Sequence, residues 1–182
     1  MKNFIMNLTY FRVISGPLIF CFSAFLDAFL LSFWIFIFAA ITDYLDGILA
    51  RRFNLESDLG KILDPIADKI LLVSSLFAIM IIANESFLNL ICLIIIIREF
   101  WVSGLREFSA KRFSDDITKV TYLAKIKTAV QFIGIATFFL TFAIQFQLGI
   151  FLSNFVLFMS MLITVKTGLD YTKNVLGHIK VS

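Results

Sequence analysis

Four aspartates next to long apolar stretches are the most informative chemical feature of this sequence. Asp43 and Asp46 lie three positions apart near the end of one apolar stretch, and Asp64 and Asp68 lie four positions apart where the next one begins. Residues three or four positions apart on a helix share one face, so each pair presents two carboxylates together. An ionised carboxylate inside a membrane span costs about 3 kcal/mol on insertion scales, and such residues usually face a cavity in which they have a function.

Two helices joined by a short linker pack antiparallel, so the two aspartate pairs are expected to face each other across an oxygen-lined pocket. Four negative charges repel one another unless cations lie between them, and hard oxygen ligands favour Mg²⁺ or Mn²⁺. No His or Cys lies nearby to favour zinc. Two such ions can hold a phosphoryl group and stabilise both the attacking and the leaving oxygen. We therefore predict phosphoryl transfer on a lipid, whereas each aspartate taken singly is equally compatible with a solvated helix cap.

Small and basic residues flank the aspartates at helical spacing. Gly47 and Ala50 continue the face of the first pair and leave room for a bulky ligand against the backbone. Arg51 offers a guanidinium fork that suits phosphate. Gly60 lies one turn before Asp64. These neighbours favour a bulky, phosphate-bearing ligand.

The elements that must position these residues are membrane-spanning helices. Of the 182 residues, 60% are hydrophobic and 23 are Phe, whereas soluble domains are about 45–50% apolar. A span needs about 20 apolar residues. The sequence has six such stretches, at about 10–26, 28–47, 65–84, 87–105, 121–144 and 149–168. We predict an all-α integral membrane protein with six transmembrane helices in a single domain (residues 1–182), which begins with a short amphipathic segment (residues 1–12).

The basic residues predict which ends of the spans face the cytoplasm. Lys and Arg fall at both termini and around the joints between spans two and three and between spans four and five. The turns around Asp27, Glu85 and Gln145 contain none. The positive-inside rule then places both termini and the two basic loops in the cytoplasm. Because the basic residues follow membrane sidedness and form no continuous face, a nucleic-acid partner is not expected.

The aspartates and their neighbours together resemble the signature of a known enzyme family. The pattern DxxDGxxAR, followed after eight residues by GxxxDxxxD, matches the CDP-alcohol phosphotransferases at eight fixed positions over 26 residues. The resemblance implies a six-helix membrane enzyme, commonly a homodimer, that transfers a phosphatidyl or related group from a CDP-linked lipid to an alcohol and releases CMP.

The same resemblance implies roles for individual residues. It makes Asp43, Asp46 and Asp64 ligands of two divalent metal ions, and Asp68 the general base and a possible further ligand. The family's N-terminal pattern of Asn, Pro, Asn and Thr is altered here, but Thr9 still fits it and is a candidate nucleotide contact. The implied contacts to the CDP moiety are Asp43, Gly47, Ala50, Arg51, Gly60 and Thr9.

Segments later in the sequence narrow the choice of acceptor substrate. Residues 64–69, 94–108, 124–131 and 167–174 resemble the bacterial phosphatidylglycerophosphate synthases. That subgroup implies CDP-diacylglycerol and sn-glycerol 3-phosphate as substrates, and the bacterial inner membrane as the location. A phosphorylated acceptor calls for basic residues near the carboxylates, and the candidates are Arg98, Arg106, Lys125 and Lys127.

Among these candidates Arg98 is the strongest, because it directly follows five apolar residues and is costly there unless it faces a polar site. Each of the others taken alone is better explained as a topology charge. Lys125 and Lys127 point in nearly opposite directions on a helix, so only one is expected to face the pocket. Glu99 and Glu107 are candidate partners of the arginines.

Two alternatives remain at this point. The first keeps the chemistry but changes the acceptor to serine, inositol phosphate or phosphatidylglycerol, because the metal signature does not separate these. The second is a divalent-cation transporter, which predicts carboxylates spread through the membrane depth and an internal repeat. The four aspartates instead cluster near one edge, and the sequence contains no evident repeat.

Overall fold

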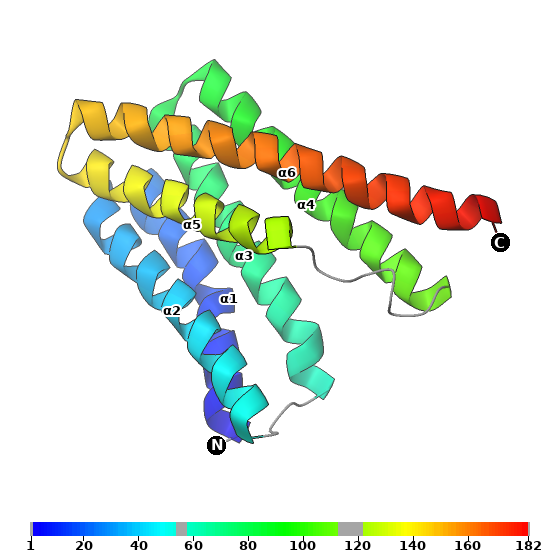
Figure 1. Cartoon of the computed structure of the whole chain (residues 1–182). Coiled ribbons are helices and arrows are strands. Elements are labelled where there is room, and N and C mark those ends of the chain that lie inside the picture. The colour runs from blue at the N-terminus through cyan, green and yellow to red at the C-terminus, as the bar shows by residue number, and fades with distance from the viewer. Residues whose placement is uncertain (1, 54–57, 113–121, 182) are drawn as a thin grey trace.

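The structure is a computed structural model that describes residues 2–53, 58–112 and 122–181. Within these ranges the side chains at 2–5, 46–53, 58, 61, 111, 122–125 and 179–181 lie outside the description. The described residues form six helices and no strand (Figure 1). The helices are α1 (Lys2–Phe25), α2 (Phe29–Phe53), α3 (Asp58–Ala83), α4 (Ser86–Arg112), α5 (Tyr122–Ala143) and α6 (Gln147–Val181).

Each predicted span coincides with one of these helices. Five of them contain stretches long and apolar enough to cross a membrane, namely Met6–Phe25, Ile62–Ala83, Ser86–Ala110, Ile126–Ala143 and Gln147–His178. The described apolar part of α2, Phe29–Leu45, is shorter. Large apolar side chains such as Trp34, Ile97 and Phe151 are exposed on the outside of the bundle, which is expected of surfaces that meet lipid. The chain is therefore an all-α, multi-pass membrane protein.

The N-terminal segment differs from the prediction of a separate amphipathic stretch. Helix α1 begins at Lys2 and continues without a break to Phe25. Thr9 and Arg12, which would face the membrane surface in the predicted arrangement, are only 2% and 0% exposed. Their polar groups have partners on α2 and α3, so this part of the chain packs into the bundle.

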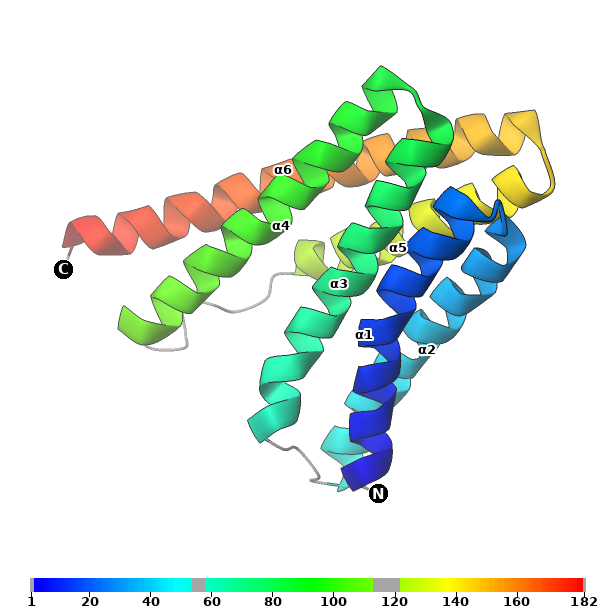
Figure 2. The ribbon, with the colours of Figure 1, turned by 180° about the vertical axis from the view of Figure 1, so that it is seen from behind.

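Three short turns reverse the chain at one end of the bundle. Asp27, Asn84 and Gln145 have positive φ angles of 50°, 47° and 54°, which end α1, α3 and α5 in the left-handed conformation. Figure 2 shows these turns at the upper right, with both termini away from them. These are also the turns that lack Lys and Arg. The other helix ends lie away from these turns and diverge, with those of α1, α2 and α3 in one direction and those of α4 and α6 in another (Figure 2).

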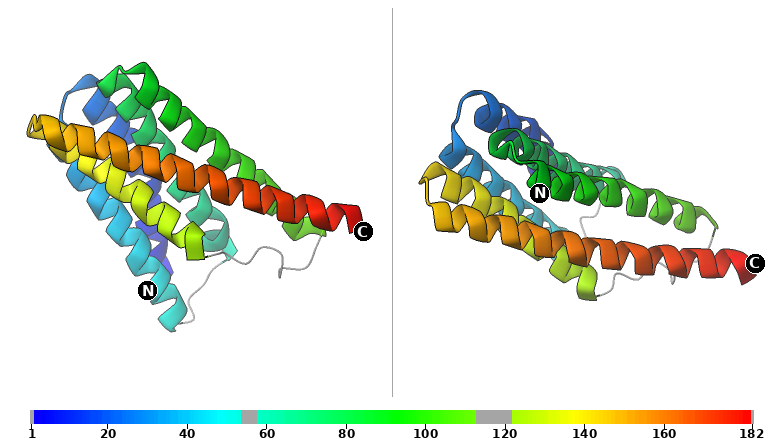
Figure 3. Two further views of the ribbon diagram at one scale, coloured as in Figure 1. Left: turned by 45° about the horizontal axis from the view of Figure 1, so that its top comes forward. Right: turned by 90° about the horizontal axis from the view of Figure 1, so that it is seen from above.

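The bundle contains two sets of closely packed helices. Helix α1 packs against α2 and α3, while α6 packs against α4 and α5; Figure 3 shows α5 and α6 side by side. Buried side chains from several helices, among them Ile19, Phe36, Leu76, Ile95 and Phe138, join the two sets in a common apolar core.

Gly16 allows the close crossing of α1 and α3. A Cβ atom at this position would lie 2.8 Å from the carbonyl oxygen of Ile70, and a backbone atom cannot move aside as a flexible side chain can. Gly16 is four residues after Arg12, so this crossing also sets how closely Arg12 approaches α3.

Replacing Gly16 tests this crossing. We expect Gly16→Ala to lower the free energy of unfolding by about 1–3 kcal/mol, because the added methyl group overpacks the α1–α3 contact. The measurement is the thermal unfolding midpoint of the purified protein in detergent. Gly104→Ala is the matched control, because a Cβ there meets no atom within 4 Å. Equal midpoints for the two variants would contradict this account of the crossing.

Candidate active site

Three helices meet at the guanidinium group of Arg12. From α1, the Nη1 atom of Arg12 donates to Oδ1 of Asp43 on α2 and, at 2.6 Å, to Oδ1 of Asp68 on α3. Its Nη2 atom donates to Oδ1 of Asp64 at 3.0 Å. We call Asp43, Asp64 and Asp68 the carboxylate cluster. The predicted approach of Asp43 to Asp64 and Asp68 is confirmed, but the predicted direct packing of α2 against α3 is wrong, because α1 packs against both helices and Arg12 links the aspartates.

Thr9 supports the same cluster from α1. Its Oγ1 atom donates a hydrogen bond of 2.9 Å to Oδ1 of Asp64. Thr9 precedes Arg12 by three positions, so the two side chains share one face of α1. The structure thus assigns the Thr9 hydroxyl to orienting an aspartate, while the contact to a nucleotide stays a prediction.

The cluster is buried on one side and accessible on the other. The side chain of Arg12 is 0% exposed, whereas those of Asp43, Asp64 and Asp68 are 42%, 42% and 44% exposed. Three carboxylates against one guanidinium leave an excess of negative charge at an accessible surface. Such a surface attracts cations.

The donor chemistry of the cluster fits a hard divalent cation, because carboxylate oxygens are what Mg²⁺ and Mn²⁺ prefer. Among the described side chains, however, no three acidic, His or Cys residues are grouped so that they could hold an ion directly. The guanidinium of Arg12 lies where the carboxylates converge. A metal ion therefore fits the residue types, but it has to share or replace the contacts of Arg12.

Several predicted site residues lie beyond the described side chains. Asp46, Gly47, Ala50 and Arg51 belong to the last turns of α2, and Lys125 belongs to the first turn of α5, but their side chains lie outside the description. Gly60 is described and half-buried near the start of α3, before Asp64. The roles predicted for all of these residues stay predictions.

A second polar cluster joins α4, α5 and α6. Nη1 of Arg98 donates to Oε1 of Glu99 at 3.1 Å, and Nη2 donates to Oγ1 of Thr167 at 2.9 Å. Lys127 donates to the same Oε1 atom of Glu99. We call Arg98, Glu99 and Lys127 the basic cluster. The predicted pairing of Glu99 with an arginine is confirmed, and the structure adds Lys127 to it.

Not all the predicted basic residues enter this cluster. The guanidinium carbon of Arg106 lies 5.9 Å from the centroid of the Tyr171 ring, a cation–π contact with α6. The basic cluster has a further neighbour in Gly168, where a Cβ would lie 3.0 Å from Nε of Arg98. Gly168 therefore leaves the space that Arg98 occupies.

Sequence reasoning counted Arg12 among the topology charges and as a match to the altered N-terminal family pattern, but it did not predict that Arg12 contacts the aspartates. The argument applied to Arg98 identifies it too, because Arg12 stands close to the start of an apolar stretch and is costly there without a polar partner. Thr167 and Gly168 were inside a segment of family resemblance but had no assigned role. Lys69 was also passed over, and its Nζ atom contacts the Ser103 hydroxyl, which links α3 to α4.

Comparisons with known proteins agree with the signature. A profile of the family described as CDP-alcohol phosphatidyltransferase matches residues 5–168. A protein of Wigglesworthia glossinidia brevipalpis is 39% identical over 130 residues, which cover 70% of this chain and 71% of that protein. One of Rickettsia bellii is 37% identical over 143 residues, or 76% and 75% of the two chains.

A third relative, from Cereibacter sphaeroides, is 45% identical over 120 residues, which are 64% of this chain and 52% of that protein. The matched region thus spans only about half of the length of this relative. All three relatives are named CDP-diacylglycerol–glycerol-3-phosphate 3-phosphatidyltransferase.

The basic cluster predicts a specific stability effect for Glu99→Gln. Removing this carboxylate leaves the charges of Arg98 and Lys127 buried side by side, so we expect the free energy of unfolding to fall by about 3 kcal/mol. The measurement is the thermal unfolding midpoint in detergent, with Glu85→Gln in the exposed α3–α4 turn as the control. A midpoint for Glu99→Gln equal to that of the control would show that Glu99 does not hold the cluster together.

Proposed function

The chain belongs to the CDP-alcohol phosphatidyltransferase family, and we propose that it transfers the phosphatidyl group of CDP-diacylglycerol to sn-glycerol 3-phosphate. The products are phosphatidylglycerophosphate and CMP. The observation that carries this proposal is the accessible carboxylate cluster on α2 and α3. The contact of Lys69 with Ser103 joins α3 to α4, the helix that carries Arg98 and Glu99 of the basic cluster. The names of the three relatives support the two substrates.

The reaction exchanges one phosphorus–oxygen bond for another. A free hydroxyl oxygen of the acceptor attacks the phosphorus atom that carries diacylglycerol, and the bond from that phosphorus to CMP breaks. When bound, two divalent ions, Mg²⁺ or Mn²⁺, offset the negative charge of the pyrophosphate. We propose that Asp43, Asp46 and Asp64 hold them, and that Gly47, Ala50, Arg51 and Gly60 contact the CDP moiety.

Asp68 is the proposed general base. Its side chain is 44% exposed, so a substrate hydroxyl can reach it, and the hydrogen bond from Arg12 fixes its position. A carboxylate within hydrogen-bonding distance of the attacking hydroxyl can accept its proton as the new bond forms.

The basic cluster is the proposed site for the phosphate of the acceptor. Arg98 and Lys127 contribute two positive charges against the single carboxylate of Glu99, which leaves a positive excess that suits an anion. The Nε atom of Arg98 is buried and has no hydrogen-bond partner among the described residues, so the guanidinium retains a spare donor. Arg106 and Lys125 are proposed to add to the positive potential around this site.

The enzyme's setting is proposed from the charge pattern and the family. The three turns without Lys or Arg favour the side away from the cytoplasm, so both clusters are proposed to face the cytoplasm at the bacterial inner membrane. A homodimer is proposed from the family resemblance. Divalent-cation transport is not favoured, because the described aspartates gather around one guanidinium and the sequence contains no evident repeat.

The acceptor is tested by CMP release. Purified protein in detergent receives CDP-diacylglycerol and Mg²⁺ or Mn²⁺, with glycerol 3-phosphate, serine, inositol phosphate or phosphatidylglycerol in separate reactions. We expect release with glycerol 3-phosphate alone. Release with a different acceptor would overturn the acceptor assignment, and no release with any of them would overturn the proposed enzyme activity.

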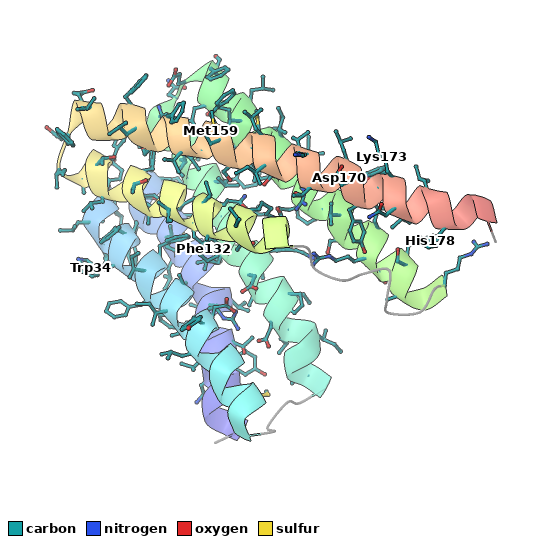
Figure 4. The ribbon with its side chains drawn as sticks, viewed as in Figure 1. Trp34, Phe132, Met159, Asp170, Lys173 and His178 are labelled. Atoms are coloured by element: carbon teal, nitrogen blue, oxygen red, sulfur yellow. The ribbon has the colours of Figure 1, made fainter. Side chains whose placement is uncertain are left out.

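If Asp68 is the general base, replacing it lowers turnover but leaves metal binding unchanged. We expect Asp68→Asn to lower kcat at least about 100-fold, because the amide cannot accept the proton, while Mn²⁺ still binds. CMP release measures turnover, and the electron paramagnetic resonance signal of free Mn²⁺ measures binding. Asp170→Asn is the control, since Asp170 is an exposed residue of α6 (Figure 4). Unimpaired turnover in Asp68→Asn would refute the assignment of the base.

A further inference from the structure

Arg12 is more deeply buried than the three aspartates of the carboxylate cluster that it contacts. It is 0% exposed, and both of its terminal nitrogens donate to aspartates. An unpaired guanidinium in such a place costs several kcal/mol, and removing either partner from a buried ion pair is strongly destabilising. The contacts of Arg12 with the aspartates therefore offset the cost of burying its charge.

These contacts place the Arg12 guanidinium, a cation, among the carboxylates that are proposed to bind metal ions. The Nη1 atom bridges Asp43 on α2 and Asp68 on α3, and Nη2 binds Asp64. Each contact uses the Oδ1 atom of its aspartate. A divalent ion held by Asp43 and Asp64 would use two of the carboxylates that Arg12 binds, so the ion and the guanidinium compete for them.

We propose that Arg12 is a built-in counter-cation, which holds the carboxylate cluster together in the metal-free protein and gives up part of its contacts when divalent ions bind. This inference rests on the metal site of the proposed function. In the metal-free protein the guanidinium offsets the repulsion among three carboxylates from two helices. In the metal-loaded protein the ions take over that task.

The packing of α1 indicates that the side chain moves while the helix stays in place. Gly16 lies against the backbone of Ile70 one turn further along α1, and Thr9 binds Asp64 one turn before Arg12. These two contacts hold α1 on either side of Arg12. A long arginine side chain can change rotamer between such anchors without moving the backbone.

The proposal predicts opposite effects on metal-free stability and on metal affinity. Without the Arg12 charge, nothing offsets the repulsion among the three carboxylates in the metal-free protein, so the unfolding midpoint in EDTA falls. The same variant no longer has a competitor for the oxygens, so Mn²⁺ binds about tenfold more tightly, which corresponds to about 1.4 kcal/mol. A residue that merely positions the aspartates for metal would instead weaken Mn²⁺ binding when removed.

The experiment compares three variants of the full chain in detergent. Arg12→Gln removes the charge, and Arg12→Lys keeps it on a group that cannot bridge as a fork. Lys173→Gln is the control, because it removes an exposed positive charge from α6, away from α1 (Figure 4). Free Mn²⁺ is measured by electron paramagnetic resonance, and the unfolding midpoint is measured in EDTA and in Mn²⁺.

We expect Arg12→Gln to have a lower midpoint in EDTA, tighter Mn²⁺ binding and a larger stabilisation by Mn²⁺ than the wild type, with Arg12→Lys between them and Lys173→Gln unchanged. Mn²⁺ affinity of Arg12→Gln that is equal to or weaker than wild type overturns the proposal while leaving the metal site intact. If Arg12→Gln does not fold, the Mn²⁺ affinity of Arg12→Lys decides. Tighter binding than in the wild type supports the proposal, and unchanged or weaker binding overturns it. Failure of the wild type to bind Mn²⁺ overturns the metal site and this inference together.

Discussion

A charge buried among apolar helices must have a partner of opposite charge, and the polar half of this bundle follows from that constraint. Arg12 meets it through aspartates on α2 and α3, so the first three helices converge at one guanidinium. Arg98 and Lys127 meet it through Glu99, and Thr167 adds a contact from α6. Elsewhere the described helices meet mainly through apolar side chains. Apolar contacts are not directional, so they restrict the rotation of a helix about its axis less than ion pairs do. The two polar clusters therefore determine how the helices are rotated about their axes.

The two clusters have opposite imbalances of charge, and this difference suits a reaction between two anions. Around Arg12 the carboxylates outnumber the guanidinium and remain accessible, as a site for divalent ions and a pyrophosphate requires. Around Glu99 the basic groups outnumber the carboxylate, as a site for a phosphorylated acceptor requires. The contact between Lys69 and Ser103 connects the helices that carry the two clusters. A shared set of membrane helices can thus hold a nucleotide-linked lipid and an anionic acceptor.

The apolar stretches and the spacing of the aspartates were sufficient to predict the helices, their turns and the convergence of Asp43 with Asp64 and Asp68. They were not sufficient to predict Arg12 at the centre. Contacts between helices far apart in the sequence depend on how closely the helices cross and how they are rotated, and the crossing of α1 with α3 depends on a single glycine, Gly16. Lys127 could not be separated from Lys125 by spacing alone, whereas the structure assigns Lys127 to Glu99. The parts of the site on the last turns of α2 rest on the sequence signature.

The central proposal is that the carboxylate cluster belongs to the metal-dependent reaction centre of this enzyme. Anomalous X-ray diffraction at the manganese edge, from crystals of the active protein grown with Mn²⁺ and a CDP-linked lipid, tests it most directly. The account predicts anomalous peaks in contact with Asp43, Asp46 and Asp64, beside the pyrophosphate. Peaks confined to other parts of the molecule, in crystals of protein that releases CMP, would contradict it.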